Sequence, residues 1–191
     1  MNLNPAGLAA GAGTTTRKLG ARRVRRAFGA LLATGALTAG ALAATAGTAN
    51  AAGFTVRIIP LTNPFLTVEV LGGGKSLGDT VDVWSGNGGA NQIWTFSPVS
   101  GGYNIINKNS GMCLTTDGVA GHTLYQFACV GNVSQVWSTG LTPGSLYAYK
   151  ITNPNSGLVM DVYGDGRSEG TPIDGWTPNG ADNQYFTATA A

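Results

Sequence analysis

Two stretches of the chain combine an acidic residue, an aromatic residue and an Asn-Gln pair at matching intervals. In the C-terminal stretch, Asp161 stands 23 residues before Gln184, and Trp176 stands eight residues before it. Asn183 directly precedes Gln184, and Asp174 lies two residues before Trp176. A sugar presents hydroxyl groups at its rim and C–H groups on one face, so carboxylate, amide and flat aromatic side chains together suit its recognition. These residue types at this spacing suit a carbohydrate-binding pocket.

The same arrangement occurs around residue 90, with one change in the acid. Glu69 stands 23 residues before Gln92, and Trp84 stands eight residues before it. Asn91 directly precedes the glutamine, and Asp82 stands two residues before Trp84, as Asp174 does before Trp176. Because Glu is one methylene longer than Asp, its acceptor oxygens are shifted by about a bond length. We expect a second pocket here, with a geometry that differs from the first.

A third copy lies between these two and lacks the acid. Gln135 and Phe127 keep the spacing of the glutamine and its upstream aromatic residue. However, Thr115 replaces the acid and Ser134 replaces the asparagine. Asp117 is an acid that could substitute, although nothing in the spacing requires it. We interpret this copy as mainly structural, with its pocket lost.

The elements that must position these residues are short alternating strands. Runs such as FTVRII, TVDVW and QIWTF are separated by Gly, Asn, Asp and Pro clusters at intervals of about ten residues, which is typical of an all-β fold. The Gln-x-aromatic units lie 43 and 49 residues apart, which gives repeats at about 54–97, 102–139 and 147–188. Three four-strand units can close a barrel with threefold pseudosymmetry, which removes exposed sheet edges.

The aromatic residues of this pattern divide into two groups. Trp94, Trp137 and Phe186 follow the alternation of inward-facing strands, and we expect them in the core. Trp84 and Trp176 are flanked by Gly, Ser, Pro and Asn, and we expect them to be exposed. The role of the three glutamines stays open, because each amide could contact a ligand or satisfy the backbone groups of a turn.

Residues 1–51 have the features of an export signal. Six basic residues and no acidic ones precede an uncharged Ala/Gly/Thr-rich run, which ends in the small-x-small sequence Ala49-Asn50-Ala51. The string RRAF resembles a twin-arginine signal, and the general secretory route is the alternative. A transmembrane anchor is disfavoured because Gly, Ala and Thr leave little transfer free energy per residue. We expect a secreted bacterial protein in which residues 52–191 form one domain.

Removal of this leader reverses the net charge. The whole chain has 11 basic and 9 acidic residues and a net charge of +2, whereas residues 52–191 keep five basic and all nine acidic residues, a net charge of −4. A mildly acidic domain with scattered lysines lacks the basic surface that nucleic acid requires. We expect no nucleic acid partner, no membrane association after cleavage, and a monomer.

The cysteines and the single histidine limit the possible chemistry. In an exported chain, the pair Cys113 and Cys129 over a short loop predicts a disulfide. A four-ligand zinc site needs more ligands than these cysteines and His122 provide, so we expect no metal and no cofactor. No nucleophile elbow surrounds any serine, which argues against a Ser-His-acid enzyme.

With its three Gln-x-aromatic units in register and its two Asn-x-Asn-Ser-Gly turns, the chain resembles the ricin-type β-trefoil lectins over residues 54–187. The resemblance implies a β-trefoil that binds sugars without catalysis, through pockets in the first and third repeats. It also implies that Asp174 and Asp82 assist as helper acids, because they stand where this family often has a polar ligand. Galactose-, xylose- or arabinose-containing glycans all suit such pockets. The positions of Cys113 and Cys129 also match the disulfide of this family.

Two other functions stay open. A trefoil can bind a protein, for example a protease, through one protruding loop, although the chain has no long basic loop for this purpose. A glycoside hydrolase needs two carboxylates that face one bond at about 5–9 Å. Here the acid pairs lie in separate repeats, and a pocket in each repeat explains them better.

Overall fold

The computed structural model describes residues 52–191, so the predicted export signal at residues 1–51 lies outside the described residues. None of the described residues forms a helix long and apolar enough to cross a membrane. The first repeat contains β1 (Phe54–Pro60), β2 (Leu66–Val70), η1 (Leu71–Gly73), β3 (Val81–Ser85), η2 (Ala90–Gln92) and β4 (Trp94–Val99), where η marks a turn of 3-10 helix. The second contains β5 (Gly102–Asn107), β6 (Cys113–Thr115), β7 (His122–Thr123), β8 (Tyr125–Phe127) and η3 (Val133–Gln135). The third contains β9 (Val159–Val162), η4 (Tyr163–Asp165), β10 (Thr171–Trp176), η5 (Asp182–Gln184) and β11 (Phe186–Ala190).

Six extended segments close into a barrel. β1 pairs antiparallel with both β11 and β4, and β4 pairs with β5. Single bridges complete the ring, from β5 to Trp137, from Ser138 to Thr152, and from Tyr149 to β11. The closed ring leaves none of these six segments as a free sheet edge, which protects them from pairing with another chain. The predicted all-β fold of three repeats is confirmed.

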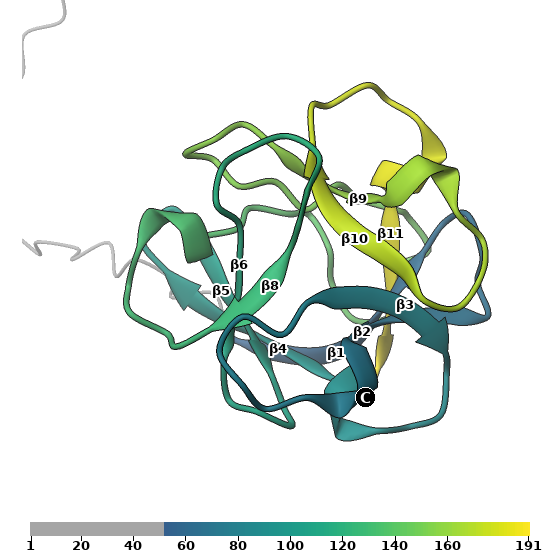
Figure 1. Ribbon diagram of the computed structural model, residues 1–191, viewed down its shortest axis with the longest axis horizontal. Coiled ribbons are helices and arrows are strands. Elements are labelled where there is room, and N and C mark those ends of the chain that lie inside the picture. Colours follow the sequence, from purple (N-terminus) through teal and green to yellow (C-terminus); the bar gives the residue numbers. More distant parts are fainter. Residues whose placement is uncertain (1–51) are drawn as a thin grey trace, which may run out of the picture. The chain divides into compact units, whose positions relative to one another are not determined.

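Six of the remaining strands form three hairpins that lie around a common centre (Figure 1), and the short β7 pairs with β10. β2 pairs with β3, β6 with β8, and β9 with β10. In each hairpin, a glycine with a positive φ lies six residues before the exposed aromatic residue, which is Trp84, Phe127 or Trp176. This glycine makes a backbone hydrogen bond to another hairpin. The backbone hydrogen bonds that link the hairpins are 2.8 to 2.9 Å long and run from Gly78 to Gln126, from Gly121 to Gly175, and from Gly170 to Val83. Each hairpin therefore depends on a neighbouring repeat.

The aromatic residues at the barrel strands form the centre of the core. Trp94, Trp137 and Phe186 are at most 1% exposed, as predicted. The indole N–H groups of the two tryptophans donate to the carbonyl oxygens of Val68 and Leu114, at 2.9 and 3.0 Å. Each tryptophan thus satisfies the one polar atom that it buries, and Phe186 has none to satisfy.

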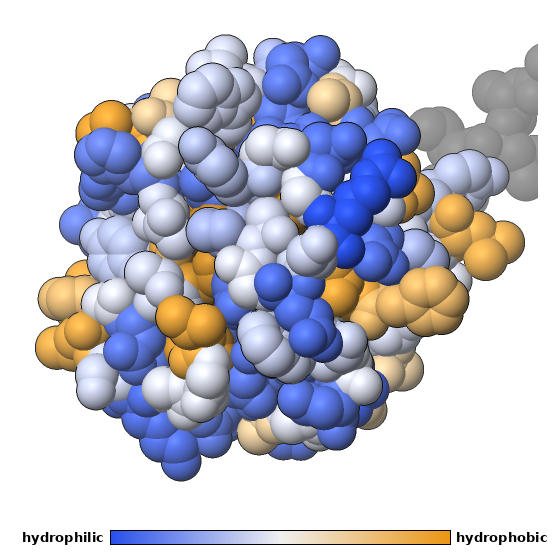
Figure 2. Space-filling model, turned by 45° about the vertical axis from the view of Figure 1, so that its right-hand side comes forward, coloured by the Kyte–Doolittle hydropathy of each residue, from blue (hydrophilic) through white to orange (hydrophobic). Residues whose placement is uncertain are grey.

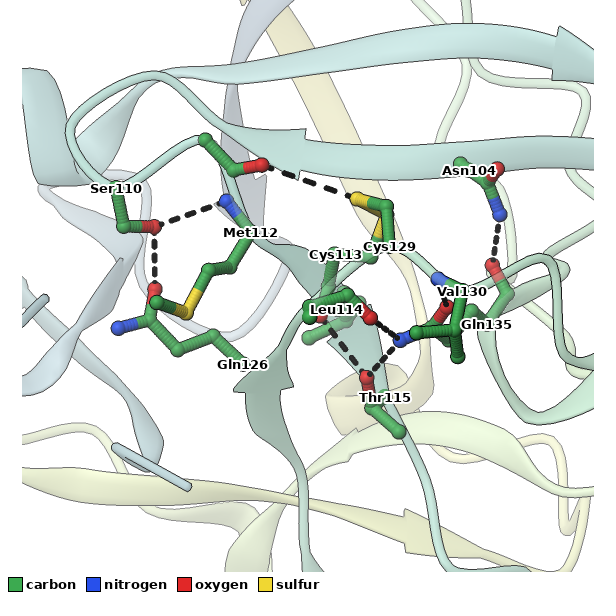
Figure 3. The surroundings of a disulfide bond; sticks show 12 residues. Asn104, Ser110, Met112, Cys113, Leu114, Thr115, Gln126, Cys129, Val130 and Gln135 are labelled. Atoms are coloured by element: carbon green, nitrogen blue, oxygen red, sulfur yellow. Dashed lines mark hydrogen bonds between the residues drawn. A yellow bond between two sulfur atoms is a disulfide. The ribbon is translucent and has the colours of Figure 1, made fainter. Parts of the chain in front are cut away.

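The predicted disulfide joins Cys113 and Cys129 (Figure 3). Cys113 is buried on β6, whereas Cys129 lies in the loop after β8. Gln135 holds the same loop, because the Val130 N–H donates to its side-chain oxygen at 3.0 Å. A covalent bond and a buried amide therefore both fix the loop of the second repeat.

We predict that replacing Cys113 and Cys129 together by serine lowers the free energy of unfolding by about 3 kcal/mol, because the cross-link restricts the unfolded chain over a separation of 16 residues. Urea denaturation followed by tryptophan fluorescence measures the loss. Reduction of the wild-type protein should give the same destabilisation. Unchanged stability in both cases would show that the bond does not constrain the unfolded chain.

Candidate functional site

A cleft of about 390 Å³ opens at the third repeat. Asp161 on β9 and Asp174 on β10 lie opposite each other in the antiparallel register, and both are almost fully buried. Trp176 ends β10 and is 42% exposed, as expected for an aromatic platform. The cleft is lined by Asp161, Tyr163, Gly164, Asp165, Asp174, Trp176, Asn179 and Asn183. The structure thus brings four of the five residues predicted for this site to one cleft.

Two amides hold the carboxylate of Asp161 in place. Asn183 donates to its Oδ1 at 2.7 Å, and Gln184 donates to its Oδ2 at 2.9 Å. The second amide hydrogen of Asn183 goes to the carbonyl oxygen of Val162 at 3.0 Å. Because each carboxylate oxygen can accept more than one hydrogen bond, Asp161 keeps acceptor capacity for a ligand while its orientation is fixed.

Gln184 does not line the cleft. Its side chain is fully buried and donates its second hydrogen to the carbonyl oxygen of Thr177 at 3.0 Å. Its oxygen accepts from the backbone N–H of Asn179 at 2.9 Å. Both amide hydrogens of Gln184 are therefore used within the protein, and none is left for a ligand. Of the two roles left open for the glutamines, Gln184 has the structural one, because it positions Asp161 and the loop. Gln92 and Gln135 occupy equivalent networks.

The first repeat forms a similar cleft of about 380 Å³ with a differently held acid. Gln92 donates to Glu69 Oε2 at 2.7 Å, but Asn91 donates to the carbonyl oxygen of Val70 instead of the carboxylate. One side-chain amide therefore orients Glu69, whereas two orient Asp161. The lining consists of Glu69, Leu71, Gly72, Gly73, Trp84, Asn87 and Asn91. Gln92 and the predicted helper Asp82 are buried outside this lining.

The second repeat uses its equivalent positions for internal contacts. Gln135 donates to the Thr115 hydroxyl at 3.1 Å, and this hydroxyl donates to the carbonyl oxygen of Cys113. Asp117 lies 2.6 Å from the imidazole of His122, and this contact lowers the pKa of the Asp117 carboxyl. Asp117 is thus engaged at the surface and does not replace the missing acid beside Gln135.

Burial and like charge raise the pKa values of the helper acids. Burial, and secondly the charge of Glu69, raises the pKa of Asp82 to about 7. Burial, and secondly the charge of Asp161, raises the pKa of Asp174 to about 6. Burial also raises the pKa of Asp161, against the hydrogen bonds from Gln184 and Asn183. Neither oxygen of Asp82, nor Oδ1 of Asp174, has a hydrogen-bond partner among the described residues.

Four lining residues of the third cleft were missed from the sequence, namely Tyr163, Gly164, Asp165 and Asn179, and so was the glycine beside its tryptophan. Tyr163 lines it from η4, two residues after the acid, where the first repeat has Leu71. Gly121 belongs to the second repeat but lies against Trp176, because a Cβ on this glycine would be 2.9 Å from the indole ring. The spacing of Tyr163 two residues after Asp161 could have predicted its place in the cleft. The contact of Gly121 with Trp176 joins two repeats, so no local sequence pattern predicts it.

The described residues contain no group of three or more side chains able to hold a metal ion.

Comparison with known proteins gives one family model, described as a ricin-type beta-trefoil lectin domain-like family, which matches residues 49–123, 90–176 and 133–191. No curated protein sequence matches significantly.

Solved structures share the fold. The designed threefold symmetric protein ThreeFoil is 23% identical with a TM-score of 0.66, over 72% of this chain and 99% of that one. The exo-beta-1,3-galactanase of Clostridium thermocellum is 25% identical with a TM-score of 0.66, over 72% of this chain but only 30% of the enzyme. A ricin B-like lectin of Macrolepiota procera, solved with lactose, is 20% identical with a TM-score of 0.60, over 72% of this chain and 95% of that one.

We predict that Gly121→Ala lowers the free energy of unfolding by about 1 kcal/mol more than Gly170→Ala does. Both glycines have similar positive φ, so the backbone strain of an alanine destabilises both variants to the same extent. A Cβ at position 121 meets Trp176 at 2.9 Å, whereas one at position 170 lies 3.8 Å from Trp84. Urea denaturation of both variants checks this, and equal destabilisation would mean that the Trp176 ring yields freely.

Asp82 should make stability depend on pH. Its pKa rises from about 3.8 to about 7 on folding, so the stability from its bound proton is complete below pH 4 and is lost as the pH rises through 7. Asp82→Asn removes this titration and should raise the free energy of unfolding at pH 8 by about 1 to 3 kcal/mol. Denaturation from pH 4 to 8 tests this, with exposed Asp182→Asn as the control. A parallel pH profile in wild type and Asp82→Asn would contradict it.

Proposed function

The chain belongs to the family of ricin-type β-trefoil lectin-like domains, and from this premise we propose that it is an exported, non-catalytic protein that binds glycans through the clefts of its first and third repeats. One observation carries the proposal most directly. The Asp161 carboxylate is fixed by Asn183 and Gln184 in a cleft that the exposed ring of Trp176 also lines.

The third cleft suits a ligand that donates hydrogen bonds and has an apolar face. Asp161 offers free acceptor sites, so two neighbouring sugar hydroxyls can donate to it, and their relative orientation selects the epimer. The face of Trp176 packs on the C–H groups of the ring. Galactose, xylose and arabinose units all present such hydroxyl pairs. Solved relatives include lectins in complex with lactose and with GalNAc.

Two clefts on one barrel make the protein bivalent. Each cleft is open and shallow, and we expect dissociation constants for single sugars of about a millimolar. A polysaccharide can occupy both clefts at once, and the second contact then forms at a high effective concentration. Avidity would therefore supply most of the affinity for a polymer, while the second repeat contributes structure.

The arrangement of the acids favours binding over hydrolysis. A hydrolase places its two carboxylates on either side of one bond. In contrast, Asp161 and Asp174 lie on neighbouring strands of one hairpin, and the amides of Asn183 and Gln184 hold Asp161 as an acceptor. On the face shown in Figure 2, hydrophobic residues form separate groups among hydrophilic ones, whereas a protein-docking surface usually has one large apolar patch.

The decisive experiment combines a glycan array with pull-downs on insoluble polysaccharides. We predict that Trp176→Ala and Trp84→Ala each weaken polymer binding about tenfold or more, and that the double variant abolishes it, because each change removes one platform. Phe127→Ala is the matched control, since this ring has the same position in the second repeat and is similarly exposed.

The other outcomes identify the alternatives. A folded wild-type protein that binds no glycan would refute the lectin function and leave a trefoil used for protein contacts. Hydrolysis of a xylan or galactan that is lost in Asp161→Ala would make the protein an enzyme.

A further inference from the structure

The third cleft carries more negative charge than its equivalent in the first repeat. Three carboxylates line it, from Asp161, Asp165 and Asp174, whereas Glu69 is the only charged residue in the lining of the first. No lysine, arginine or histidine lines either cleft. Arg167 lies 3.3 Å from Asp165 at the surface and offsets that charge, which leaves the two buried acids without a cation.

Asp174 distinguishes the two clefts. Asp82 and Asp174 occupy equivalent positions, each directly across the hairpin from the acid of its repeat. Asp174 is 2% exposed yet borders the cleft, and its Oδ1 has no hydrogen-bond partner among the described residues. Asp82 is equally buried but does not border its cleft. Because Asp174 borders the cleft and no described residue uses its carboxylate, a ligand in the third cleft finds an acceptor there that the first cleft lacks.

The groups around Asp174 do not supply a compensating charge. Among the described elements that pack on β10, β9 contributes Asp161, β3 contributes Asp82, and η4 contributes Asp165 with the phenol of Tyr163. The basic residue in this set is His122 on β7, and its ring contacts Asp117 instead. The third cleft thus presents two adjacent acceptors with uncompensated negative charge.

We propose that the cleft of the third repeat selects a sugar with a free amino group, as in an unacetylated 2-amino sugar, over its neutral counterparts. This inference rests on the proposed function. An ammonium group has three donors, no acceptor and one positive charge, which matches the pair of Asp161 and Asp174. The face of Trp176 also attracts a cation. Burial raises the pKa of Asp174 to about 6, so its carboxylate is mostly charged at pH 7 and can pair with the ammonium.

The chain supplies its own reporters for the test. Of its four tryptophans, Trp94 and Trp137 are buried and hydrogen-bonded, while Trp84 and Trp176 line the two clefts. The indole N–H signals of the ¹⁵N-labelled protein can therefore report each cleft separately. The probes are D-galactosamine, D-galactose and N-acetyl-D-galactosamine, together with the corresponding gluco sugars, all at pH 7.

We expect galactosamine or glucosamine to shift the Trp176 signal at about tenfold lower concentration than its neutral and acetylated counterparts. Asp174→Asn should reduce this affinity ratio to about one. The matched change Asp82→Asn, in the acid outside the first cleft, should leave the ratio unchanged.

Three results would overturn the inference. The first is an equal response of Trp176 to amino and neutral sugars, which would leave the proposed function intact. The second is an amine preference of the same size at Trp84, which would attribute it to the overall charge of the domain. The third is a preference that survives Asp174→Asn. If neither tryptophan responds to any sugar, the proposed function fails with the inference. The wild-type comparison of Trp176 with Trp84 remains decisive even if the Asp174 variant does not fold.

Discussion

A fully buried glutamine amide in each repeat fixes the loop after the hairpin to the first strand of that hairpin, which carries Glu69, Thr115 or Asp161. Gln92, Gln135 and Gln184 each donate to that strand's side chain and to a carbonyl seven residues upstream, and each accepts from a backbone N–H five residues upstream. Every hydrogen of the amide is used, so each bond that is lost leaves a buried polar group unpaired. The loop, the acid and the neighbouring aromatic residue are all positioned through this one side chain.

The residue that accepts from the glutamine decides what each repeat can do. Asp161 accepts from two amides, Glu69 from one, and Thr115 offers a hydroxyl that is already bonded to its own strand. The same scaffold therefore supports two candidate sites and one structural unit. In the structural unit, the disulfide Cys113–Cys129 holds the loop as well. The residue beside the glutamine thus differs between repeats while the glutamine network stays the same.

The repeats, the closed barrel and the two clefts could be predicted from the sequence, because residue spacing and strand alternation report periodicity directly. The role of Gln184 could not, since an amide can serve a ligand or the backbone and only the geometry shows that its donors are used. Asp82 and Asp174 have the same place in the pattern, yet only Asp174 reaches its cleft. The alternating run YAYKIT would be expected to form a continuous first strand of the third repeat, but it pairs only through bridges at Tyr149 and Thr152, which suffice to close the barrel.

The contact between Gly121 and Trp176 joins a glycine of the second repeat to the platform of the third. Deletion of the middle repeat would therefore remove the support of a candidate site whose own residues lie in the third repeat. Likewise, cutting the chain between the second and third units would leave the platform on one fragment and its backing on the other. The three units are therefore interdependent, because the unit that lacks the acid packs against the exposed tryptophan of its neighbour.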